Sequence, residues 1–503
     1  MGRKITLFGL LILMSVYAHG QVFNIKEFGA VAGGQTLNTI AIQKTIDAAA
    51  AAGGGKVIVP AGVFLSGTIR LKTGVELSLD KDAVLLGSTN LSDYQKNNRW
   101  YALVLADEQN DIAITGYGTI DGQGQQLALN VKKLVQNGAV VDPLKLNRPD
   151  ERFRPQVLEI QNSHGVKIQH VTLKNSACWV ETYDKCTDLL IDSITVLSTA
   201  YWNNDGIDIV DCKNVKIRDC NINAADDGIC LKSSDPNSAC ENFDISNCKV
   251  RSSASAIKFG TASVGGFRNI KIDNIAIHDT YRTALALEIV DGGAMENVTI
   301  TNINAKNTGG AVFIRLGQRQ GSKPGSIKNI LIKNLNVEIP KGKPDEGYDI
   351  AGPPGEDIYP HNILPMEIVG LPGYNIQNVI LENINVTFPG GADKRHAYVS
   401  LDSLAAIPER AKEYPEYSMF GELPAWGLYV RHASGLQFKN MTLQYTEPDF
   451  RSAIVMDDVK QAEFNGLTIP SVSLPVIVLK DVEDETFKKL NMPVTQKQAI
   501  IRK

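Results

Sequence analysis

The sequence predicts an all-β protein, a single-stranded parallel β-helix, from a repeated pattern and its spacing. Apolar residues alternate strictly in short phrases, which is typical of half-buried strands of about 4–8 residues. No helical periodicity separates these phrases, so leucine-rich and helical repeats do not fit. We expect right-handed coils stacked about 4.8 Å apart, with the handedness taken from known solenoids. The phrases begin at Gly165, Asp188, Asn214, Asn242, Asn269, Asn297, Asn329, Asn378 and Gly435.

The spacing of these starts separates coils from longer loops. The first seven starts are 23–32 residues apart, and the last two intervals are 49 and 57 residues. The long intervals predict loops near 341–376 and 389–432, and loops of that length are often functional. Their aromatic content is unlike disorder. These loop residues are Tyr348, Tyr359, His361, Tyr414, Tyr417, Phe420 and Trp426.

An N-terminal cap is expected over about 21–90, because a bare terminal coil would expose its strand edge. Residues 36–52 form an amphipathic pattern that predicts a helix, with Ile40 and Ile46 covering the first coil. Three glycines from Gly53 to Gly55 end that helix. We therefore expect one domain over 21–503.

The first twenty residues resemble a cleaved signal peptide. Arg3 and Lys4 precede an apolar run over 5–16, and small residues follow at Ala18 and Gly20. No later stretch reaches the roughly 18 apolar residues of a membrane span. The sequence predicts export to the periplasm or the medium. A net charge of −4, from 51 basic and 55 acidic residues, excludes an extended nucleic-acid surface. We expect a monomer.

Seven cysteines lie between Cys178 and Cys248, and an odd number leaves at least one unpaired. Their spacing matches no zinc motif. Disulfides and free buried thiols both remain open. We expect no metal and no cofactor.

Stacking the coils by their apolar residues places charged residues on one outward wall. Asp208, Cys230, Lys258 and Ala286 form one outward column, since side chains alternate across a strand. A second outward column contains Lys232, Glu288 and Arg315. In the bend before the strands, Asp205 stacks beside Asp227, Ser255 and Thr283, with Asp226 adjacent.

Three carboxyl groups within one coil spacing predict acid–base chemistry. Asp205, Asp226 and Asp227 repel one another, and this raises their pKa values. A raised pKa suits a general acid, and an ionised neighbour can serve as a base. For Lys232 and Arg315, plain solvent exposure is the competing interpretation.

Two motifs resemble glycoside hydrolase family 28, the polygalacturonase and rhamnogalacturonan hydrolase family. Asn203-Asn204-Asp205-Gly206 is similar to that family's Asn-Thr-Asp-Gly segment, and Asp226-Asp227-Gly228 is similar to its Asp-Asp segment, 21 residues after Asp205. The N-terminal block and Asn175-Ser176 with Trp179 also look like family sequence. The resemblance implies the pectin lyase-like fold, with Asp226 as general acid and Asp205 and Asp227 activating water for inversion.

Two departures from the family pattern make this an unusual, divergent member. The family's Gly-His-Gly falls on Ala254-Ser255-Ala256, and its Arg-Ile-Lys falls on Ala286-Leu287-Glu288. The cations that hold galacturonate in the family are therefore absent. Lys258 and Arg315 are candidates to replace them, and a structural Lys258–Glu288 ion pair is the alternative.

The candidate substrate-binding residues combine this wall with aromatic side chains suited to sugar faces. Tyr201, Tyr414 and Tyr417 are further aromatic candidates, and core packing is the alternative for each aromatic. Late loops that close one end of the cleft would make the enzyme exo-acting. The set is Asn203, Asp208, Lys232, Lys258, Glu288, Arg315, Trp179, Trp202 and Trp426.

Three functions are compatible with the sequence. The first is an inverting hydrolase of a pectic or similar plant polysaccharide, with exo action on rhamnogalacturonan-type chains as the expected form. The second is a polysaccharide lyase, in which the aspartates hold Ca²⁺ and Lys258 abstracts a proton. The third is a non-catalytic carbohydrate-binding solenoid, which the carboxyl cluster disfavours.

Overall fold

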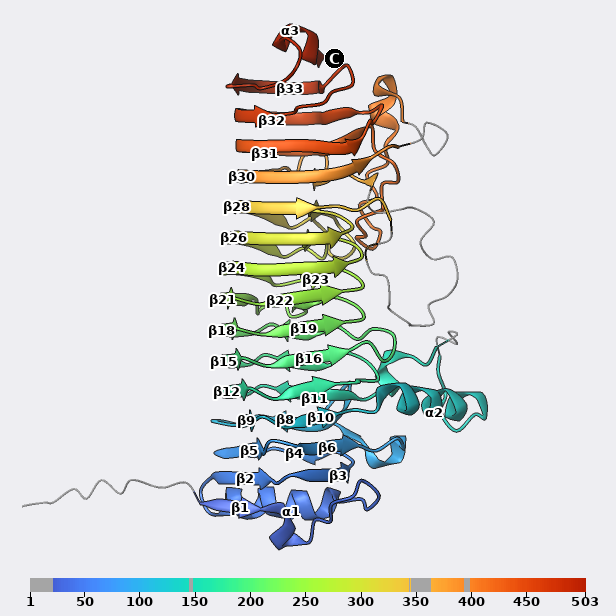
Figure 1. The fold of residues 1–503 in the computed structure, drawn as a ribbon, viewed down its shortest axis with the longest axis vertical. Coiled ribbons are helices and arrows are strands. Elements are labelled where there is room, and N and C mark those ends of the chain that lie inside the picture. Colours follow the sequence, from blue (N-terminus) through green and yellow to red (C-terminus); the bar gives the residue numbers. More distant parts are fainter. Residues whose placement is uncertain (1–20, 144–147, 343, 345–362, 393–398) are drawn as a thin grey trace, which may run out of the picture.

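The protein is an elongated stack of β-coils, with a helical cap at its N-terminal end (Figure 1). The computed structural model describes residues 21–143, 148–342, 344, 363–392 and 399–503. The predicted signal peptide and Tyr348, Tyr359 and His361 lie outside the described residues. Successive coils pair in parallel, which confirms the predicted parallel β-helix.

Each central coil contributes one strand to each of three faces. One such coil contains β17 (Ile207–Val210), β18 (Lys213–Arg218) and β19 (Asn221–Ala224), and the next contains β20 (Ile229–Ser233), β21 (Cys240–Ser246) and β22 (Lys249–Ser252). Each strand pairs with its equivalent one coil later. Further along the chain the second and third faces are crossed by single long strands, β24 (Gly266–Thr280), β26 (Ala294–Thr308), β28 (Ser326–Glu338) and β30 (Ile376–Gly390).

The face that begins each coil is called the first face here. Its side chains alternate between the core and the outside, as the sequence predicts. Ile207, Ile229 and Ile257 pair in register and are fully buried in the core. The first face consists of β8 (Tyr101–Asp107), β11 (Gln156–Gln161), β14 (Glu181–Asp184), β17, β20, β23 (Ile257–Ser263), β25 (Leu285–Ile289), β27 (Val312–Leu316), β29 (Met366–Val369) and the first residues of β31 (Ala425–Glu447), β32 (Ser452–Thr468) and β33 (Ile477–Lys488), which then continue over the other faces.

The repeated asparagines stand at left-handed bends between faces. Asn269, Asn297 and Asn329 have φ of 55°, 58° and 60°, a conformation that asparagine adopts more readily than most residues. Their side chains also bond from coil to coil, since Asn297 Nδ2 donates to Asn269 Oδ1 at 3.2 Å and Asn329 donates to Asn297 at 3.1 Å. The repeat therefore reflects both backbone geometry and a continuous amide ladder.

The N-terminal coil is covered by α1 (Thr39–Ala51), inside the predicted 36–52. Ile42, Ile46 and Ala49 lie on the inner face of this helix and are fully buried. Ile40 was expected to cover the coil, but its side chain is 71% exposed because it lies on the outer face of the helix. After the helix, Gly54 has φ of 115°, and a Cβ there would lie 2.7 Å from the carbonyl oxygen of Gly74.

A second helix, α2 (Gly124–Gln136), interrupts the early coils and was not predicted. It follows β10 (Thr119–Asp121) and projects from the side of the stack (Figure 1). Leu127, Ala128 and Val131 anchor it in the main core. Its apolar residues recur at helical spacing. The stretch is only 13 residues long and lies among strand patterns, which is why the helix was not predicted.

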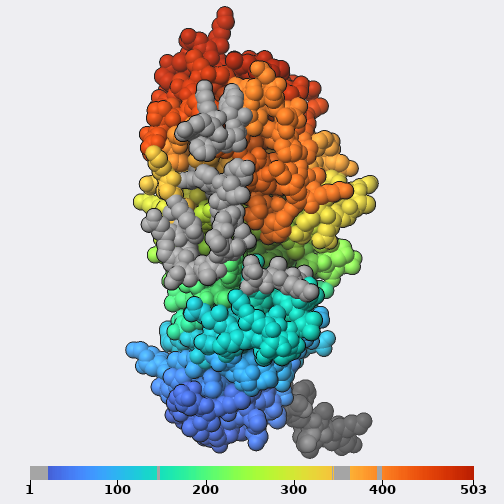
Figure 2. All heavy atoms as spheres, turned by 90° about the vertical axis from the view of Figure 1, so that its right-hand side faces the viewer, coloured from blue at the N-terminus to red at the C-terminus, as the bar shows by residue number. Residues whose placement is uncertain are grey.

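The second long loop folds back over the first face. Residues 399–424, called the strap here, include a 3₁₀ turn at Leu401–Ala406. Leu404, Tyr417 and Phe420 of the strap pack with Phe313 and Val369 in a small second core. In Figure 2 the orange atoms around residue 400 cover the upper part of this side, above the cyan atoms of the α2 region.

The seven cysteines are all buried and free. They behave as small apolar side chains within the coils, which resolves the question of pairing left open by their number. Within the described part of the chain, no helix is long and apolar enough to cross a membrane.

Replacing Asn297 tests the amide ladder. Asn297→Gly keeps the left-handed bend but removes the side-chain bonds. Asn297→Ala removes the same bonds and retains a Cβ, which costs roughly 1–2 kcal/mol in this conformation when no side-chain amide compensates for it. We expect the thermal unfolding midpoint to fall in the order wild type, Gly variant, Ala variant, as measured by circular dichroism. An Ala variant as stable as the Gly variant would contradict the role assigned to the bend.

Candidate active site

A cleft of about 470 Å³ opens on the first face between the α2 region and the strap. Strands β11, β14, β17, β20 and β23 form its floor, residues 98–100 border it at the N-terminal side, and Tyr414 borders it from the strap. Its lining residues include Arg99, Trp100, Glu159, Trp179, Thr182, Asp184, Asn203, Asp205, Asp226, Asp227, Lys232, Lys258, Arg319 and Tyr414.

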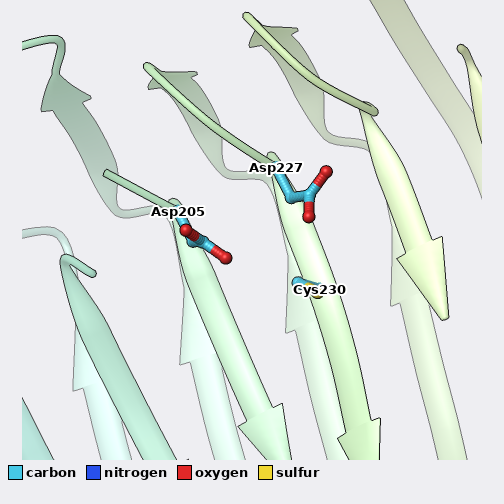
Figure 3. A group of neighbouring side chains, drawn as sticks. All are labelled: Asp205, Asp227 and Cys230. Atoms are coloured by element: carbon cyan, nitrogen blue, oxygen red, sulfur yellow. The ribbon is translucent and has the colours of Figure 1, made fainter. Parts of the chain in front are cut away.

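The predicted acidic group lies together in this cleft. Asp205 and Asp227 occupy the bends before β17 and β20, and Figure 3 shows them at the starts of adjacent strands, with Cys230 further along the second strand. Carboxylate oxygens of Asp205 and Asp227 and the sulfur of Cys230 lie within 4.8 Å of one another. Asp226 precedes Asp227 in the same bend and is half-buried. The backbone N–H of Ser255 donates to Asp227 Oδ1 at 3.1 Å.

The three aspartates do not titrate alike. Burial, with the charges of Asp205 and Asp227, raises the pKa of Asp226 to about 7. Burial also raises the pKa of Asp205 to about 8, despite the ammonium of Lys232. The expectation that all three pKa values rise is wrong for Asp227. Burial acts upward there too, but Lys258, Lys232 and Arg282 outweigh it and hold the pKa of Asp227 below its usual range.

Lys232 ties the lower part of the acidic group together. Its ammonium contacts Asp205 at 3.1 Å and also pairs with Asp208, whose side chain is fully buried beneath the cleft. The same Nζ lies 4.2 Å from the ring centroid of Trp179. Asp208 is not among the residues that line the cleft, so it acts on the site through Lys232.

Lys258 is in the cleft as predicted, but its carboxylate partner is different. Its ammonium contacts Asp227 Oδ2 at 3.1 Å. Glu288 is buried nearby, one strand further, and burial raises its pKa to about 8 even though Lys258 opposes the rise. The acidic group is thus held by two buried ammonium groups, and Lys258 faces the acid that is ionised.

Asn203 and Trp202 support the rim rather than the floor. Asn203 Oδ1 accepts from Arg154 Nη2 at 2.7 Å, and the backbone carbonyl of Trp202 accepts from Arg154 Nη1 at 2.6 Å. Arg148 lies over the Trp202 ring at 4.3 Å. Asn203 lines the cleft, while Trp202 stands behind it.

Two predicted substrate-binding residues are structural instead. Arg315 has no exposed surface, and its guanidinium donates to the backbone carbonyls of Val369, Gly370 and Glu409. It anchors the strap and cannot replace the missing family cation. Trp426 is 1% exposed and packs edge-on between Phe388 and Tyr445 in the core, which is the alternative that the sequence left open.

Two charged residues near the acidic group were not predicted. Arg282 stands one residue before the predicted bend position Thr283 and pairs with Glu416 of the strap at 3.2 Å. Arg319 pairs with Asp291 at 2.7 Å and lies near the ring of Tyr414. Of the predicted strap aromatics, Tyr414 lines the cleft, whereas Tyr417 and Phe420 are buried in the second core.

Asp205, Asp227 and Cys230 are the described residues closest to a metal-binding geometry. Lys232 Nζ lies 3.1 Å from Asp205 and 3.0 Å from the sulfur of Cys230, so an ammonium already supplies the positive charge there. A cation would have to displace Lys232 from its buried carboxylate partners. The donor set therefore fits a lysine-compensated acid pair better than a metal centre.

A parallel β-helix with paired acids in a first-face cleft is the architecture of a β-helical glycoside hydrolase. The model of "Glycosyl hydrolases family 28" matches residues 51–280 of this chain. A "Probable polygalacturonase" of Vitis vinifera is 26% identical over 74% of this chain and 75% of its own length.

Two further relatives extend the comparison. An "Exo-poly-alpha-D-galacturonosidase" of Dickeya chrysanthemi is 24% identical, over 67% of this chain and 65% of its own length. The solved structure of a "hyperthermoactive Exopolygalacturonase from Thermotoga maritima" is 23% identical, with a TM-score of 0.56 over 73% of this chain and 87% of that protein. At this identity the structural likeness shows the shared fold.

Arg315→Met tests the structural role of this arginine. The substitution leaves three buried carbonyls without their donor, and we expect a loss of roughly 2–4 kcal/mol in the free energy of unfolding. Urea denaturation measures this loss. Arg99→Met, at an arginine that lines the cleft with its side chain 55% exposed, is the matched control and should cost under about 1 kcal/mol. Equal stability of the Arg315 variant and the wild type would contradict the assignment.

Proposed function

We propose that the protein hydrolyses glycosidic bonds of a pectic polysaccharide with inversion of configuration. The observation that carries the proposal is the pair of adjacent carboxyls, Asp226 and Asp227, whose pKa values are pushed in opposite directions. The match to the family model supports the same roles, because both aspartates lie within residues 51–280 and on a motif similar to that of the family. Inverting hydrolysis needs one protonated and one ionised carboxyl on opposite sides of the scissile bond.

Asp226 is the proposed general acid. Its pKa near 7 keeps a substantial protonated fraction at neutral pH, and its half-buried side chain stands at the open side of the bend. It transfers its proton to the glycosidic oxygen as the bond to the anomeric carbon breaks. The leaving group then departs as a neutral alcohol.

Asp227 is the proposed base, with Asp205 beside it. Lys258 keeps Asp227 ionised, so its carboxylate can accept a proton from a water that attacks the anomeric carbon. Asp205 helps to orient that water, and Lys232 holds Asp205 in place at 3.1 Å. The proton taken by Asp227 and the proton given by Asp226 balance over one turnover.

The segments that border the two ends of the cleft support exo action. The strap borders one end with Tyr414, while residues 98–100 border the other end. The Dickeya chrysanthemi relative is named an exo-enzyme, which favours the same mode for this chain. The signal-like residues 1–20 support export to the periplasm or the medium, and we propose a single catalytic domain over 21–503, acting as a monomer.

The lyase alternative is weaker, because Lys258 is unsuited to act as a base. Burial favours its neutral form, but Asp227 and neighbouring groups raise the pKa of Lys258 well above its ordinary value. It therefore remains protonated at neutral pH. The proposed calcium ligands already face the ammonium groups of Lys232 and Lys258. A non-catalytic carbohydrate-binding solenoid would give no reason for three clustered acids.

Asp226→Asn tests the general acid. We expect turnover of pectic oligosaccharides to fall by about 10³-fold or more with an unchanged unfolding midpoint, because the side chain is outside the core. Reducing-end release and product NMR would measure rate and anomeric configuration. Asp244→Asn, at an exposed residue of β21, is the control and should retain activity. Retained activity in Asp226→Asn sinks the assignment, and product absorbing near 235 nm would instead indicate a lyase.

The pH profile tests the two pKa values. Activity should decline above about pH 7, where Asp226 loses its proton, and below the usual aspartate value of 3.8, where Asp227 gains one. In Lys258→Met the pKa of Asp227 rises, so the acidic limb of kcat/KM should move upward by about one pH unit or more. An unchanged acidic limb would contradict the proposal that Lys258 lowers the pKa of the base, Asp227.

A further inference from the structure

The cleft continues from the aspartates toward the N-terminal coils, and its lining changes there. The acidic end is defined here by Glu159 of β11 and Asp184 of β14, with Thr182, Trp100 and Trp179. Glu159 pairs in register with Thr182, and Asp184 follows two residues later on the same strand. None of these residues has a role in the proton transfers proposed above.

Glu159 presents an acceptor that the protein leaves unused. Its side chain has no exposed surface, and Oε1 accepts from Gln161 Nε2 at 3.1 Å. Oε2 is buried and has no hydrogen-bond partner among the described residues. A buried polar atom without a partner is costly, and functional sites are where such atoms are retained. A donor from a ligand in the cleft would complete its bonding.

The surrounding charges are unfavourable to an anion. Asp184 and Asp107 both act to raise the pKa of Glu159, after burial itself, to about 8. Asp184 is half-buried, and neither it nor Glu159 forms an ion pair within the described part of the chain. Two cations lie at this end, and both are paired elsewhere. Arg99 contacts Glu151 at 3.1 Å, and Lys232, whose Nζ lies 4.2 Å from the Trp179 ring, pairs with Asp205 and Asp208.

The same end offers an aromatic surface. The rings of Trp100 and Trp179 lie with centroids 5.1 Å apart, and both residues line the cleft. Trp100 is 5% exposed and backs the half-buried Trp179. Such a surface packs against the C–H face of a pyranose ring, leaving the hydroxyls of the ring to reach polar side chains.

We propose that the acidic end is a subsite for an uncharged sugar ring and that it disfavours a uronate ring. The ring hydroxyls donate to Glu159 Oε2 and Asp184, and its apolar face lies against Trp179. A uronate would bring another carboxylate into a group that lacks its own counter-ions. The proposal rests on the proposed function, which supplies a pectic chain, and it specifies that neutral sugars of such a chain occupy this end.

Binding to matched ligands tests the subsite without turnover. In the Asp226→Asn background, calorimetry gives Kd for an α-1,4-linked oligogalacturonide and for the same oligosaccharide with its carboxyls reduced to alcohols. We expect the ratio of the acidic to the neutral Kd to fall about tenfold when Glu159→Gln and Asp184→Asn are introduced together. Asp184→Asn alone, at a half-buried position, should shift the ratio in the same direction if the double variant fails to fold.

The control makes the same two kinds of substitution on a different face. Glu241→Gln with Asp244→Asn, both in β21, should leave the ratio unchanged. An unchanged ratio in the cleft variants, an equal shift in the control, or no binding of either ligand by the parent would overturn the subsite. Tighter binding of a matched 6-amino analogue than of the neutral ligand would overturn it as well, because the subsite would then prefer a cationic sugar to an uncharged one.

Hydrolysis by the wild-type enzyme separates this proposal from the proposed function. A shifted binding ratio without hydrolysis of any pectic oligosaccharide refutes the function and leaves the subsite. Hydrolysis with an unshifted ratio refutes the subsite and leaves the function.

Discussion

Parallel pairing in strict register between coils is the constraint on which the rest of the structure depends. Asp208, Cys230, Lys258 and Ala286 stand in one column because each strand of the first face pairs with the same positions of the next. A spacing of about 4.8 Å between strands then brings groups far apart in the sequence within bonding distance. The left-handed asparagines keep the bends equal, so the register persists along the stack.

Charge compensation determines how the column becomes a reactive site. Lys232 and Lys258 are both buried against carboxylates, which costs solvation free energy that close pairing offsets. Their unequal placement is what differentiates the aspartates, since Lys258 faces Asp227 while Asp226 has no ammonium within ion-pair distance among the described residues. The same backbone spacing would otherwise give equivalent acids.

The sequence alone predicted the coil, the inward and outward alternation and the place of the acidic group, because all three follow from a local period. It could not place residues whose position depends on long-range packing. Arg315 stands in an outward column, yet the strap covers it and its guanidinium bonds to three carbonyls. The sequence predicted Trp426 to be an aromatic residue of the second long loop, but it lies at the start of β31 and packs inward. Arg282 pairs with Glu416 of the strap, a contact that no local period predicts.

The strap also has a consequence for how such a protein can diversify. Met366 of β29 pairs directly with Leu428 of β31, so the long excursion between them leaves the ladder uninterrupted. The pairing of the coils does not depend on the length or composition of the strap. A lineage, or a designer, can exchange the strap as a module and present a different wall to the cleft, while the coils that carry the catalytic bend, four coils before β29, keep their pairing.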